Sequence, residues 1–290
     1  MIMRGPEKPN LRLLRRWFRH LAHLPVVALI HTAFTGNEYP ERMHRVIEHF
    51  CDVLPSMHHL RRVELTVGSP ALMKTLVHCI SKSSITDVNL RGPSTWHQHG
   101  EDQALNRATL REFMSWLKSK NATTFALETY RFECKDAEIE SFYTAIEAAD
   151  ALERLIWTNC EMPQALSQLV PDGIWNVLPQ LLNLTLVDFS ETCLNVADEE
   201  ALATALVGSN AMSRTRVRVL SLKNNIVLDE VAMALAAAFR LDAILVSVER
   251  RLYVTKEVIL TNNNGVDDMR HIVDTRIPPN VKIILSWSHY

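Results

Sequence analysis

The sequence has little glycine, and it lacks the short motifs that carry common catalytic and phosphate-binding sites. Only 8 of its 290 residues are glycine, so turns whose backbone N–H groups cradle a phosphate are scarce. The patterns Gly-x-Ser-x-Gly, His-Glu-x-x-His and Gly-x-Gly-x-x-Gly do not occur. The sequence therefore predicts a protein without catalytic activity, cofactor or metal.

Long apolar runs and a cysteine framework are also missing. No stretch of about 18 apolar residues occurs, so we expect no membrane span. The five cysteines are widely spaced and include no Cys-x-x-Cys, which argues against a disulfide framework and against a zinc knuckle. A reducing compartment suits such a chain, and we predict a cytoplasmic protein.

The net charge is small, but it is unevenly distributed. The formal net charge is −2 at pH 7, which favours neither nucleic acid nor an anionic membrane as a partner. Residues 1–62 and 213–290 have an excess of basic side chains, whereas residues 63–212 are acidic on balance. This distribution either steers a charged protein partner or is an ordinary solvated surface.

Three isolated features are weaker indications of chemistry. Residues 68–75 resemble a phosphate-binding loop, but Met73 stands where that loop needs a second glycine. His97 and His99 could place two metal ligands on one side of a strand, but no suitable Cys, Asp or Glu lies near them. Cys160 fits a small buried hydrophobic residue better than it fits a thiol nucleophile.

A short apolar motif recurs along the chain, and segments that favour helices separate its copies. The clearest copy, from Val217 to Asn225, has the pattern L-x-x-L-x-L-x-x-N. The copies begin at residues 60, 85, 127, 152, 181, 217 and, weakly, 241. Between copies, residues 138–149 repeat apolar residues at helical spacing, and residues 229–239 are strong helix formers. Short strands that alternate with helices predict a parallel sheet flanked by helices.

This pattern resembles the leucine-rich-repeat family, in particular its ribonuclease-inhibitor-like branch. In that branch a helix follows each strand, and the position held here by Cys160 or Asn225 is Cys or Asn. The resemblance implies an α/β leucine-rich-repeat solenoid, in which a curved parallel sheet carries helices on its convex side. It divides the chain into an N-terminal cap with a first degenerate repeat (residues 1–59), leucine-rich repeats (60–250) and a C-terminal cap (251–290).

Both ends differ from the repeats, as the caps of a solenoid do. Residues 10–23 place leucine and aromatic residues on one side of a helix and arginines elsewhere, which predicts a helical, amphipathic N-terminal cap. The same arginine-rich segment is an alternative candidate for a mitochondrial presequence. Near the other end, residues 281–287 predict a closing strand after Pro278 and Pro279.

Residues between the repeated apolar positions are expected to face away from the core, because strand side chains alternate between two faces. Stacked strands would align these residues in rows on the concave face. We predict a first row of Glu64, Asn89, Arg131, Ile156, Thr185, Ser221 and Leu245, and a second row of Arg91, Glu133, Thr158, Asp188 and Lys223.

The long insertion at 91–107 is a second candidate surface, since long loops are often functional and Trp96 belongs to the residue type most enriched in interface hot spots. The candidate partner-binding residues are therefore Glu64, Asn89, Arg91, Arg131, Glu133, Thr158, Asp188, Lys223 and Trp96.

The resemblance implies a non-catalytic scaffold that binds another protein through its concave sheet. The mixed charge of the rows differs from a basic stripe, so we expect no nucleic-acid partner. One alternative is the substrate-recognition part of a ubiquitin-ligase adaptor, a role that is frequent in the family. Two others are an enzyme on an irregular α/β domain and a part of a longer receptor or regulatory protein.

Overall fold

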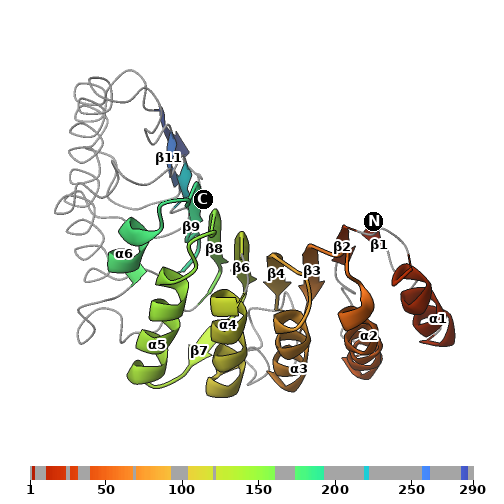
Figure 1. Ribbon diagram of the computed structural model, residues 1–290. Coiled ribbons are helices and arrows are strands. Elements are labelled where there is room, and N and C mark those ends of the chain that lie inside the picture. Colours follow the sequence, from red (N-terminus) through yellow and green to blue (C-terminus); the bar gives the residue numbers. More distant parts are fainter. Residues whose placement is uncertain are drawn as a thin grey trace, which may run out of the picture. The chain divides into compact units, whose positions relative to one another are not determined.

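Strands of a parallel sheet alternate with helices along the chain, as the sequence predicts (Figure 1). The computed structural model describes residues 2–3, 11–23, 27–31, 40–67, 70–92, 104–119, 122–160, 174–192, 219–221, 257–261 and 282–286. The chain divides into two compact units, Met1–Ala149 (unit 1) and Asp150–Tyr290 (unit 2).

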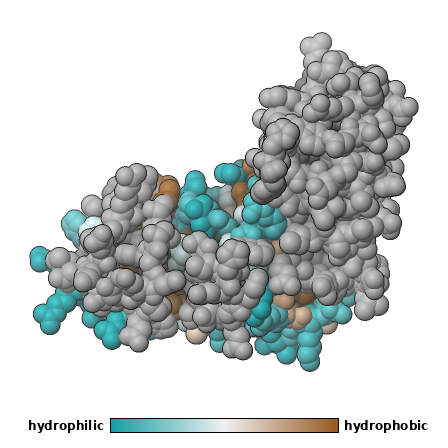
Figure 2. Space-filling view, turned by 180° about the vertical axis from the view of Figure 1, so that it is seen from behind, coloured by the Kyte–Doolittle hydropathy of each residue, from teal (hydrophilic) through white to brown (hydrophobic). Residues whose placement is uncertain are grey.

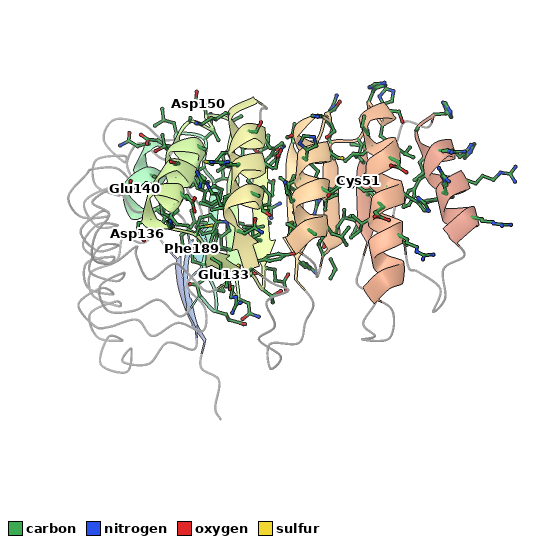
Figure 3. All side chains as sticks on the ribbon, turned by 90° about the horizontal axis from the view of Figure 1, so that it is seen from below. Cys51, Glu133, Asp136, Glu140, Asp150 and Phe189 are labelled. Carbon is green, nitrogen blue, oxygen red and sulfur yellow. The ribbon has the colours of Figure 1, made fainter. Side chains whose placement is uncertain are left out.

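Unit 1 has helices on one face of its sheet. Its elements are β1 (Ile2–Met3), α1 (Leu11–Leu21), β2 (Ala28–His31), α2 (Pro40–Val53), the 3-10 helix η1 (Leu54–Ser56), β3 (Arg62–Thr66), α3 (Pro70–Ser81), β4 (Asp87–Arg91), β5 (Ala104–Asn106), α4 (Arg107–Ser119), β6 (Thr124–Glu128), β7 (Arg131–Glu133) and α5 (Asp136–Glu147). The main sheet has the parallel order β1-β2-β3-β4-β6. Figures 1 and 3 show α1 to α5 side by side on the same face of these strands.

The strands of unit 1 are paired so that their apolar residues stand side by side. The paired residues are Leu29, Val63, Val88 and Phe125 and, two residues later, Leu65, Leu90 and Leu127. All of them are buried. Because the side-chain period of a strand is two, the residues between them face away from the helices.

The turns that enter β3, β4, β6 and β9 share one hydrogen-bond arrangement. The carbonyl oxygen of Val27 accepts hydrogen bonds from the N–H groups of Arg61 and Arg62, at 2.8 and 3.1 Å. The same arrangement joins Thr86 and Asp87 to the Arg61 carbonyl, Thr123 and Thr124 to the Thr86 carbonyl and, within unit 2, Thr185 and Leu186 to the Glu153 carbonyl. Each of these four turns therefore satisfies a backbone carbonyl at the entry of the neighbouring strand.

An aromatic cluster fills the space between β6 and the helices. The ring of Phe125 lies 5.1 Å from that of Phe113 and 5.8 Å from that of Trp116, both on α4, and 6.0 Å from that of Phe142 on α5. Trp116 also donates its Nε1–H to the carbonyl of Ile85, at 3.0 Å. All five residues are fully buried, so this cluster holds the sheet against α4 and α5.

The N-terminal amphipathic helix predicted for residues 10–23 is confirmed as α1. Phe18 and Leu21 are buried, and Phe18 packs on Phe50 of α2 with ring centroids 5.6 Å apart. The arginines at positions 15 and 19 are exposed. The apolar stripe seen in the sequence is therefore the face that contacts α2.

The motif copy predicted to begin at Leu127 has the wrong register. Leu127 pairs with Leu90, so it stands at the end of its strand, and Phe125 holds the position predicted for Tyr130. Residues 131–133 form β7, which pairs with β5 in a separate two-stranded sheet. Tyr130 is nevertheless buried and donates its hydroxyl to the Val67 carbonyl at 2.8 Å, which explains why it continues the apolar pattern.

Unit 2 has a second run of parallel strands. Its described elements are β8 (Arg154–Thr158), α6 (Ile174–Val177), the 3-10 helix η4 (Leu178–Gln180), β9 (Leu186–Asp188), β10 (Val219–Ser221), β11 (Glu257–Thr261) and β12 (Lys282–Ser286). They follow the order β8-β9-β10-β11-β12. The paired residues are Leu155, Val187, Leu220, Val258 and Ile283.

The strands of unit 2 test two predictions for the second half of the chain. The closing strand predicted at residues 281–287 is confirmed as β12, whereas β11 was not predicted. The copy predicted to begin at Leu181 is displaced by three residues, because Val187 and not Leu184 pairs with Leu155. The weak copy at residue 241 and the helix predicted at 229–239 lie outside the described residues.

Candidate partner-binding surface

The face of β3, β4 and β6 that is turned away from α3 and α4 is lined mainly by polar residues. We call it the outer sheet face. It comprises Arg62, Glu64 and Thr66 on β3, Asp87, Asn89 and Arg91 on β4, and Thr124, Ala126 and Glu128 on β6. Glu64 and Asn89 are paired side by side, as the sequence predicts for the first row. Arg91 stands between Thr66 and Glu128 in the next row.

Four of these side chains form a chain of ion pairs across the three strands, which we call the Arg91 network (Arg62, Glu64, Arg91 and Glu128). Arg91 places its Nη2 3.3 Å from Oε1 of Glu64 and its Nε 2.8 Å from Oε2 of Glu128. Arg62 places its Nη2 3.4 Å from the other carboxylate oxygen of Glu64. The carboxylate of Glu64 is thus shared by two guanidinium groups.

The members of the Arg91 network differ in exposure. The Glu64 side chain is 13% exposed, whereas those of Arg91 and Glu128 are 43% and 40% exposed. Glu64 therefore lies at the base of the network, and the charged groups around it remain accessible to water. Exposed ion pairs contribute only about 0–1 kcal/mol to folding, so the network matters more for the charge pattern of the surface than for stability.

A second polar group lies at the entry end of β4. The carboxylate of Asp87 accepts a hydrogen bond of 2.8 Å from the Thr123 hydroxyl and one of 3.3 Å from the Thr86 hydroxyl. These contacts hold an acidic group in place at the edge of the outer sheet face. Sequence reasoning missed Asp87, Arg62 and Glu128 because it considered only two positions of each motif and misplaced the motif at residue 127.

Arg131 and Glu133 do not belong to the predicted rows. Both lie on β7, where the guanidinium of Arg131 contacts the carboxylate of Glu133. Figure 1 shows β7 beside α4 and α5, away from the strands of the main sheet. The positions predicted for them are held by Ala126, which is buried, and Glu128. This correction follows directly from the five-residue register error at Leu127.

In unit 2, Ile156 and Ser221 share a row as predicted, whereas the residues predicted around β9 are displaced. Asp188 pairs with Ile156 and therefore stands in the first row rather than beside Thr158 in the second. Its carboxylate accepts hydrogen bonds from the backbone N–H and the hydroxyl of Ser190, so it caps a turn. Thr185, predicted for the first row, lies instead in the strand-entry turn and donates its hydroxyl to the Glu153 carbonyl at 2.9 Å. The predicted residues Trp96, Lys223 and Leu245 lie outside the described residues.

The isolated chemical features of the sequence have ordinary structural positions where they are described. Cys160 is fully buried, as predicted. Helix α3 begins at Pro70, and the hydroxyl of Thr75 donates to the Ala71 carbonyl of the preceding turn, at 3.1 Å. In the described part of the chain, no three His, Cys, Asp or Glu side chains gather as a metal site requires.

The described surface is predominantly polar. Figure 2 shows hydrophilic residues over most of the coloured surface, with hydrophobic ones in small areas. Among the described residues, the only large hydrophobic side chains that are clearly exposed are those of Val27 and Leu182, at 59% and 56%. No helix in the described ranges is long and apolar enough to cross a membrane. No family model matches the sequence, and no curated protein gives a significant match.

Proposed function

We propose that the chain is a leucine-rich-repeat solenoid of the ribonuclease-inhibitor-like type. The recurring hydrogen bonds of the strand-entry turns support this architecture, because a stack of equivalent turns is the contact that joins neighbouring units of a solenoid. The aligned apolar residues of β2, β3, β4 and β6 support it as well. So does the placement of α1 to α5 on one face of the sheet, the face opposite to which carries no helix among the described residues of unit 1 (Figure 3).

On this architecture we propose that the chain is a non-catalytic scaffold, which binds another protein through the outer sheet face. The observation that carries the proposal is the Arg91 network, which places alternating charges on three adjacent strands. Charges of both signs at fixed positions select a partner of complementary pattern and reject others. The partner would present carboxylates toward Arg62 and Arg91, and hydrogen-bond donors toward Asp87 and Glu128.

Arg91 is the expected centre of binding. Arginine is enriched in interface hot spots, and its guanidinium has five N–H donors in a planar fork. The contacts with Glu64 and Glu128 use Nη2 and Nε. A partner carboxylate or carbonyl can therefore bind through Nη1 without displacing either ion pair.

Replacement of Arg91 by alanine should weaken partner binding about tenfold or more, which corresponds to about 1.4 kcal/mol, while folding stability changes by less than about 1 kcal/mol. The partner would first be trapped with a photo-crosslinking residue at position 89, and Lys118 on α4 would be the site of a control crosslinker. Dissociation constants for the trapped protein would then be measured for the parent and Arg91→Ala.

Arg111→Ala is the matched control, since Arg111 is an exposed arginine on α4, on the helical side of the sheet. It should leave the dissociation constant unchanged. Equal affinity of the parent and Arg91→Ala, or equal crosslinking from positions 89 and 118, would rule out the outer sheet face as the binding surface. Circular dichroism of each variant establishes that the fold is intact.

A further inference from the structure

Helix α1 is divided into two sides of different chemistry. Six of its 11 residues are apolar and the other five are arginine or histidine, so the helix contains no acidic residue. Because a helix turns about 100° per residue, these five residues share an arc of about 140°, on which no other residue of α1 lies. We call this side the basic arc, and it consists of Arg12, Arg15, Arg16, Arg19 and His20.

The basic arc faces water at the end of a row of helices. All five of its side chains are exposed, whereas Phe18 and Leu21 on the opposite side are buried, and Phe18 packs on α2. Figure 1 shows α1 beyond α2, as the last helix of this row in unit 1. Figure 3 shows nitrogen-tipped side chains that extend from α1 away from α2. The arc is therefore accessible to a large partner.

The charges of the basic arc are not balanced within the described part of unit 1. Arg15, Arg16 and Arg19 have no acidic partner among the described residues. Elsewhere in the same row, arginine is paired between helices: Nε of Arg107 on α4 lies 2.8 Å from Oε1 of Glu138 on α5. The arc thus differs from the mixed, paired charges of the neighbouring helices.

This arrangement of charge does not stabilise α1. Arg12 and Arg16, and likewise Arg15 and Arg19, are like charges four residues apart, which disfavour a helix. The first turn contains Arg12 and no acid, although the positive end of the helix dipole favours acidic residues there. A partner that carries phosphate groups would neutralise the arc and relieve this repulsion.

The small net charge of the whole chain hides this local concentration. Helix α1 carries four positive charges and no negative one, and the formal net charge of the chain is −2, so the remaining residues carry −6. An anionic partner is therefore attracted to the α1 end and repelled, on balance, by the rest of the chain. This asymmetry suits a surface that only α1 touches.

Apolar side chains next to the basic arc favour a lipid bilayer over a nucleic acid. Trp17 is partly exposed at the border between the two sides of α1. Val27 is 59% exposed and lies four residues after His23, within about 14 Å of chain. Such groups enter the region between lipid headgroups and acyl chains, where tryptophan is enriched. The arc itself has no amide or aromatic side chain that could read or stack bases.

We propose that α1 attaches the chain to the surface of a bilayer that contains anionic phospholipids. The guanidinium groups of the basic arc donate paired N–H hydrogen bonds to headgroup phosphates. Phe18 and Leu21 stay packed within unit 1, so α1 lies on the headgroups and does not insert. The contact is electrostatic and reversible, and it does not involve the outer sheet face.

The first test measures sedimentation of the full chain with vesicles of phosphatidylcholine, with or without phosphatidylserine. We expect binding only where phosphatidylserine is present, and weaker binding as salt is added, because salt screens exposed charges. No binding to the phosphatidylserine vesicles at low salt would overturn the proposal.

A triple variant, Arg15→Gln with Arg16→Gln and Arg19→Gln, removes three charges of the arc. Each arginine close to an anionic membrane strengthens binding about fivefold, so the variant should bind about one hundredfold more weakly. Glutamine is a good helix former and ends the repulsion, so the unfolding temperature should equal or exceed that of the parent.

The matched control combines Lys74→Gln, Arg111→Gln and Lys118→Gln. These three exposed residues lie on α3 and α4, so the control has the same net charge as the triple variant but an intact basic arc. It should bind phosphatidylserine vesicles nearly as the parent does. An equal loss of binding in the two variants would show that net charge, and not α1, determines the contact, which contradicts the proposal.

A footprint of the parent chain tests the contact without any substitution. Phenylglyoxal modifies accessible arginines, and peptide mapping by mass spectrometry locates the modified sites. Phosphatidylserine vesicles should protect Arg15, Arg16 and Arg19 and leave the rate at Arg111 unchanged. Equal protection of Arg111, or no protection on α1, would refute the assignment. Tighter binding to a duplex DNA fragment than to the vesicles, at equal salt and phosphate concentration, would assign the basic arc to a nucleic acid and overturn the proposal.

Discussion

Replacement of Phe125 by alanine should lower the free energy of unfolding by about 3–5 kcal/mol, the largest effect expected of a single substitution here. Phe125 is fully buried, and its ring contacts three aromatic rings on α4 and α5. Removing it leaves a cavity between the sheet and both helices. Urea denaturation followed by circular dichroism measures the loss, and hydrogen exchange should locate it within residues 1–149.

Phe132→Ala is the matched control for this prediction. Phe132 also contacts Phe142, with ring centroids 6.1 Å apart, but it lies on β7 and is only partly buried. Both substitutions remove the same atoms, so the difference between their losses in free energy of unfolding measures the effect of burial at position 125. We expect a loss of about 1–2 kcal/mol for Phe132→Ala. Equal losses would show that the cluster around Phe125 is not the centre of the core.

Gly92→Ala should cost about 2–3 kcal/mol, because no room exists for a β-carbon at this position. An ideal Cβ would lie 2.5 Å from the Thr129 hydroxyl oxygen and 2.7 Å from the Thr129 carbonyl oxygen. The N–H of Gly92 also donates to the Glu128 carbonyl at 2.7 Å. The backbone must therefore shift at the end of β4, and this hydrogen bond is expected to lengthen. Thermal or urea unfolding of the variant measures the cost.

A double variant tests whether the contact with Thr129 is the cause. Thr129 has a φ of 63°, a conformation that glycine adopts more easily than threonine. Thr129→Gly removes the hydroxyl and lets the carbonyl move, so it should recover part of the loss caused by Gly92→Ala. Simple additivity of the two single changes would show that they do not interact.

The register of residues 122–134 shows where local pattern stops being sufficient. Two overlapping segments have the same apolar spacing, one through Ala122, Phe125 and Leu127 and the other through Leu127, Tyr130 and Phe132. Both could form the strand, because a local pattern holds no information about distant partners. The choice depends on the contacts of Phe125 with α4 and α5 and on the hydrogen bond from Tyr130 to Val67.

The residues of the outer sheet face could be predicted only on strands whose motif has a single possible register. Glu64, Asn89 and Arg91 were placed correctly, since the motifs that begin at residues 60 and 85 are unambiguous. Arg131 was misplaced with its motif, and Glu128, which pairs with Arg91 at 2.8 Å, was overlooked. An ion pair between strands depends on register, and the five-residue error placed Arg131 at the position of the buried Ala126 and Glu133 at that of Glu128.

The linear pattern alone was enough for the alternation of parallel strands and helices, the buried residues of β3 and β4, and the amphipathic α1. These features follow from periods of two and of 3.6 residues, which any short window of sequence reveals. Tertiary packing decided which apolar segment became β6 and which charges meet in the Arg91 network. Each of these features joins residues of different strands or helices. Which of these residues come together depends on how the elements pack, and the spacing of the residues along the chain does not determine it.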